Sequence, residues 1–128
     1  MKASELDRYC GKRWRESFDC ADFVEWVQRD LYGRHIRIPN GRPRGDAGPP
    51  VLASMAAQFV RPTDTPADGD LVLMFDRGQT NPGHCGLYFF FDHQPQVLHL
   101  PERGGSAIHR VSDLPELDLR IQGYYAWA

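Results

Sequence analysis

The chain has 128 residues, of which 41% are hydrophobic and 25% charged, a composition that suits one domain with a single core. Its 15 basic and 17 acidic residues give a net charge of −2, which argues against general binding of nucleic acids. No apolar run approaches the ~20 residues of a membrane span, and the first residues lack the apolar core of a signal peptide. We therefore expect a protein made in the cytoplasm, with neither nucleic acid nor membrane as a partner.

The clearest helical pattern lies over residues 19–32. Asp19 is a favourable N-cap, and Gly33 follows the last periodic residue. Apolar residues between them recur at helical spacing, at Cys20, Phe23, Val24, Val27 and Leu31. The pattern predicts a helix with one face in the core.

The middle of the chain is less regular. Residues 39–50 are rich in proline and glycine and predict a loop, and a short helix is predicted over 51–59. Pro62 and Pro66 argue against regular structure from there to about Gly69.

From Asp70 onward the sequence contains short apolar runs of strand length. Strands are predicted over residues 71–75, 84–91, 97–100 and 121–127, and a turn over 92–96. A helical front half followed by antiparallel strands predicts an α+β fold with the helix packed on one face of the sheet.

The cysteines bear directly on function. Cys10, Cys20 and Cys85 are an odd number without Cys-x-x-Cys spacing, which argues against a disulfide framework and a zinc ribbon. Cys20 falls in the first turn of the predicted helix, where N–H groups and the helix dipole favour a nucleophilic thiolate. The same N–H groups could hold an oxyanion. From the spacing alone, a buried cysteine of the apolar stripe is an equally good interpretation.

Two histidines are placed to assist such a cysteine. His84 opens a predicted strand, where it could act as general base toward Cys20 and general acid toward a leaving amine; the alternative is a surface histidine. His99 lies between apolar neighbours and could orient the His84 ring; the alternative is a core histidine bonded to backbone. No role is assigned to three histidines in loop-like contexts: His35, His93 and His109.

Several short segments occur in a recognisable order. Residues 18–24 read Phe-Asp-Cys-Ala-Asp-Phe-Val, residues 69–74 Gly-Asp-Leu-Val-Leu-Met, and residues 84–88 His-Cys-Gly-Leu-Tyr. Val-Leu-His follows at 97–99 and Gly-Tyr-Tyr at 123–125. In this order they resemble the Asp-Cys-Ser-Gly-Phe-Val, Gly-Asp-Leu-Val, His-Val-Gly-Ile-Tyr and Val-His-Ala motifs and the closing strand of the NlpC-type cell-wall cysteine peptidases.

The resemblance implies a papain-like fold, with N-terminal helices packed on a small antiparallel sheet, and no metal or organic cofactor. It implies that Cys20 is the nucleophile, His84 the general base and His99 the orienting residue. The implied substrate is the peptidoglycan stem peptide, typically cut between D-glutamate and diaminopimelate. The Gly-x-x-aromatic stretch at 11–14 resembles that of small phage and prophage tail-associated peptidases, which implies tail proteins as partners and the virion tail as location.

Two departures from the family pattern affect the expected site. Ala21-Asp22 replaces Ser-Gly, so a carboxylate lies one turn from the nucleophile and opposes thiolate formation unless it caps the helix or faces away. The Tyr-x-x-Gly-Gly segment that helps form the oxyanion hole is shortened, which makes Asp19, Trp14 and Tyr9 the candidate supporting residues.

These departures keep a second function open, a catalytically weak or inactive tail-assembly or wall-binding module on the same fold. A metal site from Cys20, His84, Cys85 and His99 is a weaker alternative, because neighbouring residues of a strand point to opposite faces. Cys85 replaces a core valine and is predicted to pack in the core. In the Pro/Gly loop, Arg42 and Arg44 are candidates to bind a substrate carboxylate.

Overall fold

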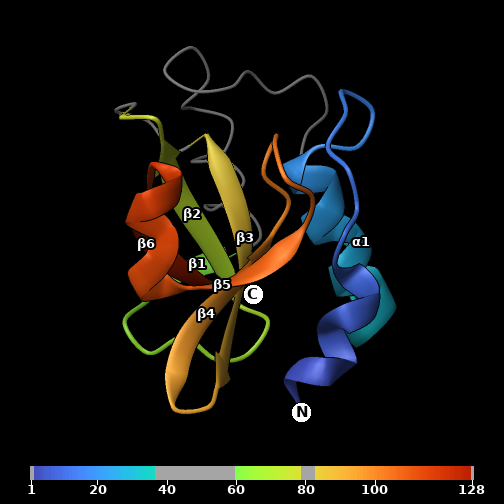
Figure 1. Ribbon diagram of the computed structural model, residues 1–128. Coiled ribbons are helices and arrows are strands. Elements are labelled where there is room, and N and C mark those ends of the chain that lie inside the picture. The colour runs from blue at the N-terminus through green and yellow to red at the C-terminus, as the bar shows by residue number, and fades with distance from the viewer. Residues whose placement is uncertain (1, 37–59, 79–82, 128) are drawn as a thin grey trace.

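The computed structural model describes residues 2–36, 60–78 and 83–127 (Figure 1). In chain order its elements are the 3₁₀ helix η1 (Ala3–Tyr9), α1 (Cys20–Tyr32), β1 (Val60–Thr63), β2 (Leu71–Asp76), β3 (His84–Phe91), β4 (Gln94–His99), β5 (Ala107–Arg110), the 3₁₀ helix η3 (Val111–Leu117) and β6 (Leu119–Trp127).

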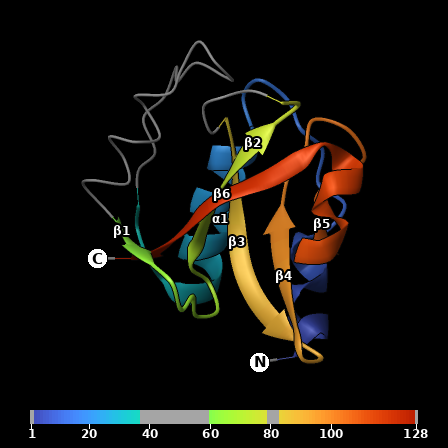
Figure 2. The same ribbon diagram turned by 90° about the vertical axis from the view of Figure 1, so that its left-hand side faces the viewer.

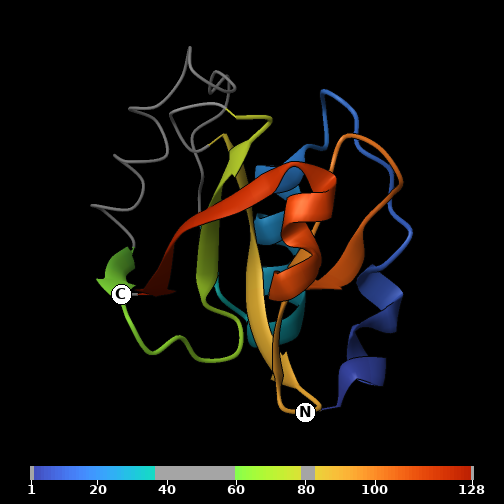
Figure 3. The same ribbon diagram turned by 60° about the vertical axis from the view of Figure 1, so that its left-hand side comes forward.

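The strands form one antiparallel sheet in the order β1-β6-β2-β3-β4-β5. Helix α1 packs on β3 and β4, whereas η3 contacts β4, β5 and β6. Figures 2 and 3 show α1 and η3 on opposite sides of the sheet. The α+β prediction, with a helix from the front half of the chain packed on a small antiparallel sheet, is confirmed.

Helix α1 begins and ends where the sequence predicts. The Asp19 carboxylate accepts hydrogen bonds from the N–H groups of Ala21 and Asp22, and the Asp22 carboxylate accepts one from the Asp19 N–H, each at 3.0 Å. This reciprocal capping box satisfies N–H groups that lack a partner within the helix. Gly33 terminates the helix with a φ of 68°, a conformation that glycine adopts without strain. Among the described residues, no helix is long and apolar enough to cross a membrane.

Side chains alternate along the central strands and divide the core between the two faces. On the face of α1, wholly buried Phe23 and Val24 pack with Leu87 and Phe89 of β3. On the opposite face, Val72, Met74 and Val97 pack with Leu114 of η3. Burying a side chain of this size contributes roughly 1.5–3 kcal/mol, so both layers fix the position of the sheet.

A buried glutamine connects α1 to the end of the chain. Gln28 is wholly buried, and its Nε2 donates to the carbonyl of Gly69 at 2.8 Å. The indole N–H of Trp127 donates to the same carbonyl at 2.7 Å. The turn before β2 is thereby bonded both to the helix and to β6.

Strand β1 corrects the expectation that prolines prevent regular structure up to Gly69. Pro62 lies within β1, opposite Tyr125 of β6. Because β1 is an edge strand, a residue without an N–H is tolerated there.

Strand β5 was not predicted, and the loop assignment of His109 is wrong because this residue pairs with Val97 of β4. The turn predicted over 92–96 is also shorter in the structure. Asp92 and His93 alone form it, with φ values of 54° and 61°, as in a two-residue hairpin. The predicted loop over 39–50, the helix over 51–59, and Arg42 and Arg44 lie outside the described residues.

Candidate active site

Cys20 is the first residue of α1 and is 3% exposed. The helix dipole at this end stabilises a negative charge on its sulfur. The Asp22 carboxylate is turned back onto the Asp19 N–H, so it acts as part of the cap. The acidic departure from the family signature therefore has a structural role at the start of the helix.

Cys85 brings the start of β3 to the start of α1. Its sulfur lies 3.9 Å from the Cys20 sulfur, with its S–H directed at Cys20. Cys85 is wholly buried in the core cluster, in agreement with the predicted packing role. Because His84 immediately precedes Cys85 in the chain, this contact holds the first residue of β3 at the N-terminus of α1.

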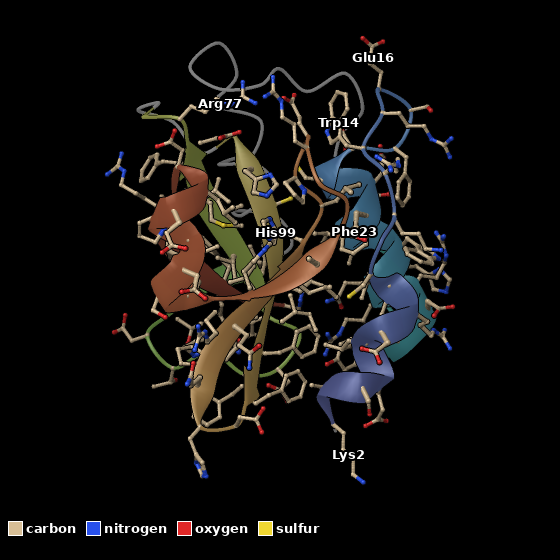
Figure 4. The ribbon with its side chains drawn as sticks, viewed as in Figure 1. Lys2, Trp14, Glu16, Phe23, Arg77 and His99 are labelled. Carbon is tan, nitrogen blue, oxygen red and sulfur yellow. The ribbon has the colours of Figure 1, made fainter. Side chains whose placement is uncertain are left out.

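Three imidazoles form a hydrogen-bonded chain across adjacent strands. His84 Nε2 lies 2.8 Å from His99 Nδ1, and His99 Nε2 lies 2.9 Å from His109 Nδ1. In the register, His99 is opposite Gly86 and His109 is opposite Val97, so the three rings follow a diagonal on one face of β3, β4 and β5. Figure 4 shows His99 within the sheet. His84 is 5% exposed and His99 is wholly buried.

Gly86 permits the close approach of β3 and β4 at this point. A Cβ atom there would lie 2.7 Å from Val97 Cγ1 and 2.9 Å from His99 Cβ. Such distances are far inside the ~3.5–4.0 Å optimum for carbon atoms. The glycine two residues after His84 is therefore required for the packing of the His99 side chain.

The pKa of the buried His99 is lowered by its surroundings. Burial lowers the pKa of His99 well below 6.5, charges on His84 and His109 lower it further, and the Cys20 thiolate raises it. His99 is consequently neutral near pH 7, with one ring N–H.

A pocket of about 520 Å³ lies beside this chain. Among the described residues, its walls include Trp14, His84 and His109. Charged residues of both signs also line it, namely Asp76, Arg77, Glu102, Arg103 and Asp118. Arg77 pairs with Glu102 at 3.0 Å. In Figure 4, Trp14 and Arg77 lie at the end of the molecule where α1 begins.

The structure separates the candidate supporting residues. Asp19 caps α1 and Trp14 lines the pocket. Tyr9 is buried away from the site, and its hydroxyl donates to Asp30 at 2.7 Å. Asp30 lies ten residues after Cys20 on α1, or roughly 15 Å along the helix axis, so the prediction that Tyr9 supports the oxyanion is corrected.

His109 is the member of the cluster that the sequence analysis missed. Residues 107–110 read Ala-Ile-His-Arg and show no apolar–polar alternation, so this short edge strand gives little strand signal in the sequence. Had β5 been recognised, its pairing with β4 would have placed His109 opposite Val97, two positions from His99 and on the same face of the sheet.

The structure also bears on the metal alternative. His84 meets His99 on one face of the sheet, whereas Cys85 meets Cys20 on the face of α1. Within residues 2–36, 60–78 and 83–127, no three His, Cys, Asp or Glu side chains are grouped to hold a metal ion.

A comparison with models of protein families gives a match over most of the chain. The model of the NlpC/P60 family matches residues 8–115, which include α1, β2 to β5 and all the residues of the imidazole chain. Neither a curated protein nor a solved structure matches the chain. The matched range covers most of the chain and contains the helix and strands that form the site. The chain therefore belongs to the NlpC/P60 family, a family of cell-wall peptidases and amidases with a papain-like fold.

Proposed function

We propose that this protein is a cysteine peptidase or amidase that hydrolyses amide bonds in peptidoglycan stem peptides. The observation that carries the proposal is the buried 2.8 Å contact between His84 Nε2 and His99 Nδ1. It orients His84 at the start of β3, next to the residue whose sulfur contacts Cys20. Membership of the NlpC/P60 family supports the class of substrate.

In the proposed mechanism, His84 acts through its Nδ1, because its Nε2 is engaged by His99. Nδ1 takes the proton of Cys20, and the thiolate attacks the carbonyl carbon of the scissile amide. His84 then gives this proton to the leaving amine, and an acyl-enzyme forms. Water, deprotonated by His84, hydrolyses the thioester and restores the thiol.

The start of α1 stabilises the negative charge that develops on sulfur and oxygen. The N–H groups of Ala21 and Asp22 donate to Asp19, so they act through the helix dipole and do not bind the oxyanion directly. Trp14, which lines the pocket with His84, is the proposed supporting residue on the substrate side.

The pocket supports a short charged peptide as substrate. Its volume of about 520 Å³ falls in the ~300–1,000 Å³ range of small-ligand sites. Arg77 and Arg103 provide positive charge for carboxylates, and Asp76, Glu102 and Asp118 provide negative charge for an ammonium group. We assign the cleaved bond to the link between D-glutamate and diaminopimelate, whose neighbourhood carries both kinds of charge.

Hydrolysis of purified peptidoglycan tests the activity, measured as newly released amino groups and by mass spectrometry of the products. Cys20→Ala is expected to abolish amine release, because the proposed mechanism uses the Cys20 sulfur as its nucleophile. Cys10→Ala is the matched control, since Cys10 lies after η1 and its S–H is directed at the carbonyl of Leu6. Undiminished hydrolysis by the folded Cys20→Ala protein would exclude the mechanism.

A second candidate function is a catalytically inactive tail-assembly or wall-binding module on the same fold. The 3% exposure of Cys20 within the core cluster favours it. Iodoacetamide distinguishes the two, because a poised thiolate is alkylated well below pH 8 and a packed thiol is not. Alkylation at Cys20 near pH 6 favours the enzyme, and resistance up to pH 8 favours the module.

We further propose a phage or prophage tail as the location. The support is the Gly-Lys-Arg-Trp stretch at 11–14, whose tryptophan lines the pocket. Detection of the protein in purified virions, by mass spectrometry of tails separated from capsids, tests this assignment. Recovery only in the unassembled fraction would contradict it.

A further inference from the structure

His109 is bonded to the proposed catalytic histidines but has no part in the mechanism above. It lies on the edge strand β5, is partly exposed, and borders the pocket. Its Nδ1 lies 2.9 Å from Nε2 of wholly buried His99. The end of a buried imidazole chain is thus a side chain that reaches solvent.

The protons of this chain are interdependent. When His84 holds the proton of Cys20, both of its ring nitrogens carry hydrogen, so His84 Nε2–H must donate to His99 Nδ1. His99 is neutral, and its single proton must then be on Nε2. That N–H faces His109 Nδ1, which must be an unprotonated acceptor.

The opposite order of protons is incompatible with the mechanism. A His99 protonated on Nδ1 would direct an N–H at the N–H of the His84 imidazolium, across 2.8 Å. A neutral imidazole has no strong intrinsic preference between its two nitrogens, so a neighbour must select one. His109 is the neighbour that the structure provides on the Nε2 side.

We propose that His109 is a positioning residue, which accepts the Nε2–H of His99 and so holds His99 in the tautomer that can receive a hydrogen bond from the His84 imidazolium. This inference rests on the proposed functions of Cys20 and His84. In this role His109 acts through His99.

Titratable and charged groups surround His109. His99 faces His109 from β4. The pocket that His109 borders is also lined by Asp76, Arg77, Glu102, Arg103 and Asp118. Arg110, the next residue, pairs with Asp113 at 3.0 Å. A hydrogen on His109 Nδ1 would make this atom a donor to His99 and reverse the hydrogen-bond chain, so the role requires His109 Nδ1 to be the acceptor.

Two variants of nearly equal shape test whether a hydrogen-bond acceptor is required at the position of His109 Nδ1. His109→Asn places an amide oxygen near the position of Nδ1, whereas His109→Leu has no acceptor there. We expect His109→Leu to lower kcat about tenfold or more with KM changed less than twofold, and His109→Asn to keep kcat within about threefold of the native protein. His93→Asn, in the exposed β3–β4 turn, is the matched control.

Nitrogen-15 spectra of the histidine rings test the tautomer directly, on the protein without substrate. We expect His99 Nε2 to carry the proton in the native protein and in His109→Asn, and the proton to be divided between the nitrogens in His109→Leu. A native His99 protonated on Nδ1 overturns the inference, as does an equal loss of kcat in the Asn and Leu variants. The native spectrum requires neither a folded variant nor hydrolytic activity, so it decides the inference even if peptidoglycan is not the substrate.

Discussion

Replacing Gly86 with alanine should lower both the stability of the protein and its hydrolytic activity. The added Cβ would lie 2.7 Å from Val97 Cγ1, 2.8 Å from the carbonyl oxygen of Leu98 and 2.9 Å from His99 Cβ. Two of these neighbours are rigid, because the carbonyl is in the β4 backbone and the His99 Cβ is attached to it. Strands β3 and β4 must therefore separate at the register position that holds the His84–His99 contact.

The cost follows from these contacts. Overpacking a filled core costs typically 1–3 kcal/mol, and three short contacts, two of them with rigid atoms, correspond to the upper end, about 3 kcal/mol. Alanine also restricts the unfolded chain, which returns about 0.5–1 kcal/mol. The net loss is about 2 kcal/mol, or a fall in Tm of roughly 6–10 °C for a domain of this size.

Gly123→Ala is the matched control in the same sheet. Its added Cβ would come no closer than 3.4 Å to the Tyr125 ring, an ordinary contact, so its stability should stay within about 1 kcal/mol of the native protein. Urea denaturation gives the two free energies of unfolding, and amine release from peptidoglycan gives the activities. Equal stability and equal activity of Gly86→Ala and Gly123→Ala would refute the argument that Gly86 positions His99.

Three further predictions concern the N-cap residue Asp19, the buried His99, and Tyr9, which lies away from the candidate site. Asp19→Ala should lower the free energy of unfolding by about 1 kcal/mol in urea denaturation, because two hydrogen bonds to the helix N-terminus are lost, whereas Asp19→Ser should restore most of it. The folded-state pKa of His99 lies below its unfolded value, so its contribution to stability is complete above about pH 6.5 and is lost at lower pH, with a slope of at most about 1.4 kcal/mol per pH unit. Denaturation at pH 5 and pH 7.5 should show this loss in the native protein and a smaller one in His99→Leu; an equal loss in both would contradict it. Tyr9→Phe should lower the free energy of unfolding by about 0.5–1.5 kcal/mol, because the hydrogen bond to Asp30 is lost, and should leave kcat unchanged. A large fall in kcat would instead support a role for Tyr9 at the oxyanion.

The sequence predicted those parts of the fold that carry strong local signals. The helix over 19–32 has both a polar N-cap and a glycine at its end, and the strand over 84–91 is a long apolar run, so each is recognisable without tertiary information. Strand β1 is held by pairing with β6, and the paired residues are 61 to 67 positions apart in the chain, from Thr63↔Tyr124 to Val60↔Trp127. A local pattern that contains Pro62 does not predict such a strand.

The positions of the candidate site residues were predictable in part, for the same physical reason. Cys20, His84 and His99 are each at a recognisable position on a predicted helix or strand. The role of His109 depends on strand register, because a shift of one residue would turn its ring to the other face of the sheet. Tyr9 was misassigned because its hydroxyl bonds to the far end of α1, a geometry that spacing along the chain does not reveal.

The position of β6 has a consequence for the order in which the molecule is assembled. β6 lies between β1 and β2, and β2 in turn carries β3 with His84. A nascent chain that ends before Leu119 therefore has an open edge on β2, an unpaired β1, and a Gly69 carbonyl without the Trp127 bond. Cys20, His84 and His99 are therefore all synthesised before the strand that joins β1 to β2 and completes the six-stranded sheet.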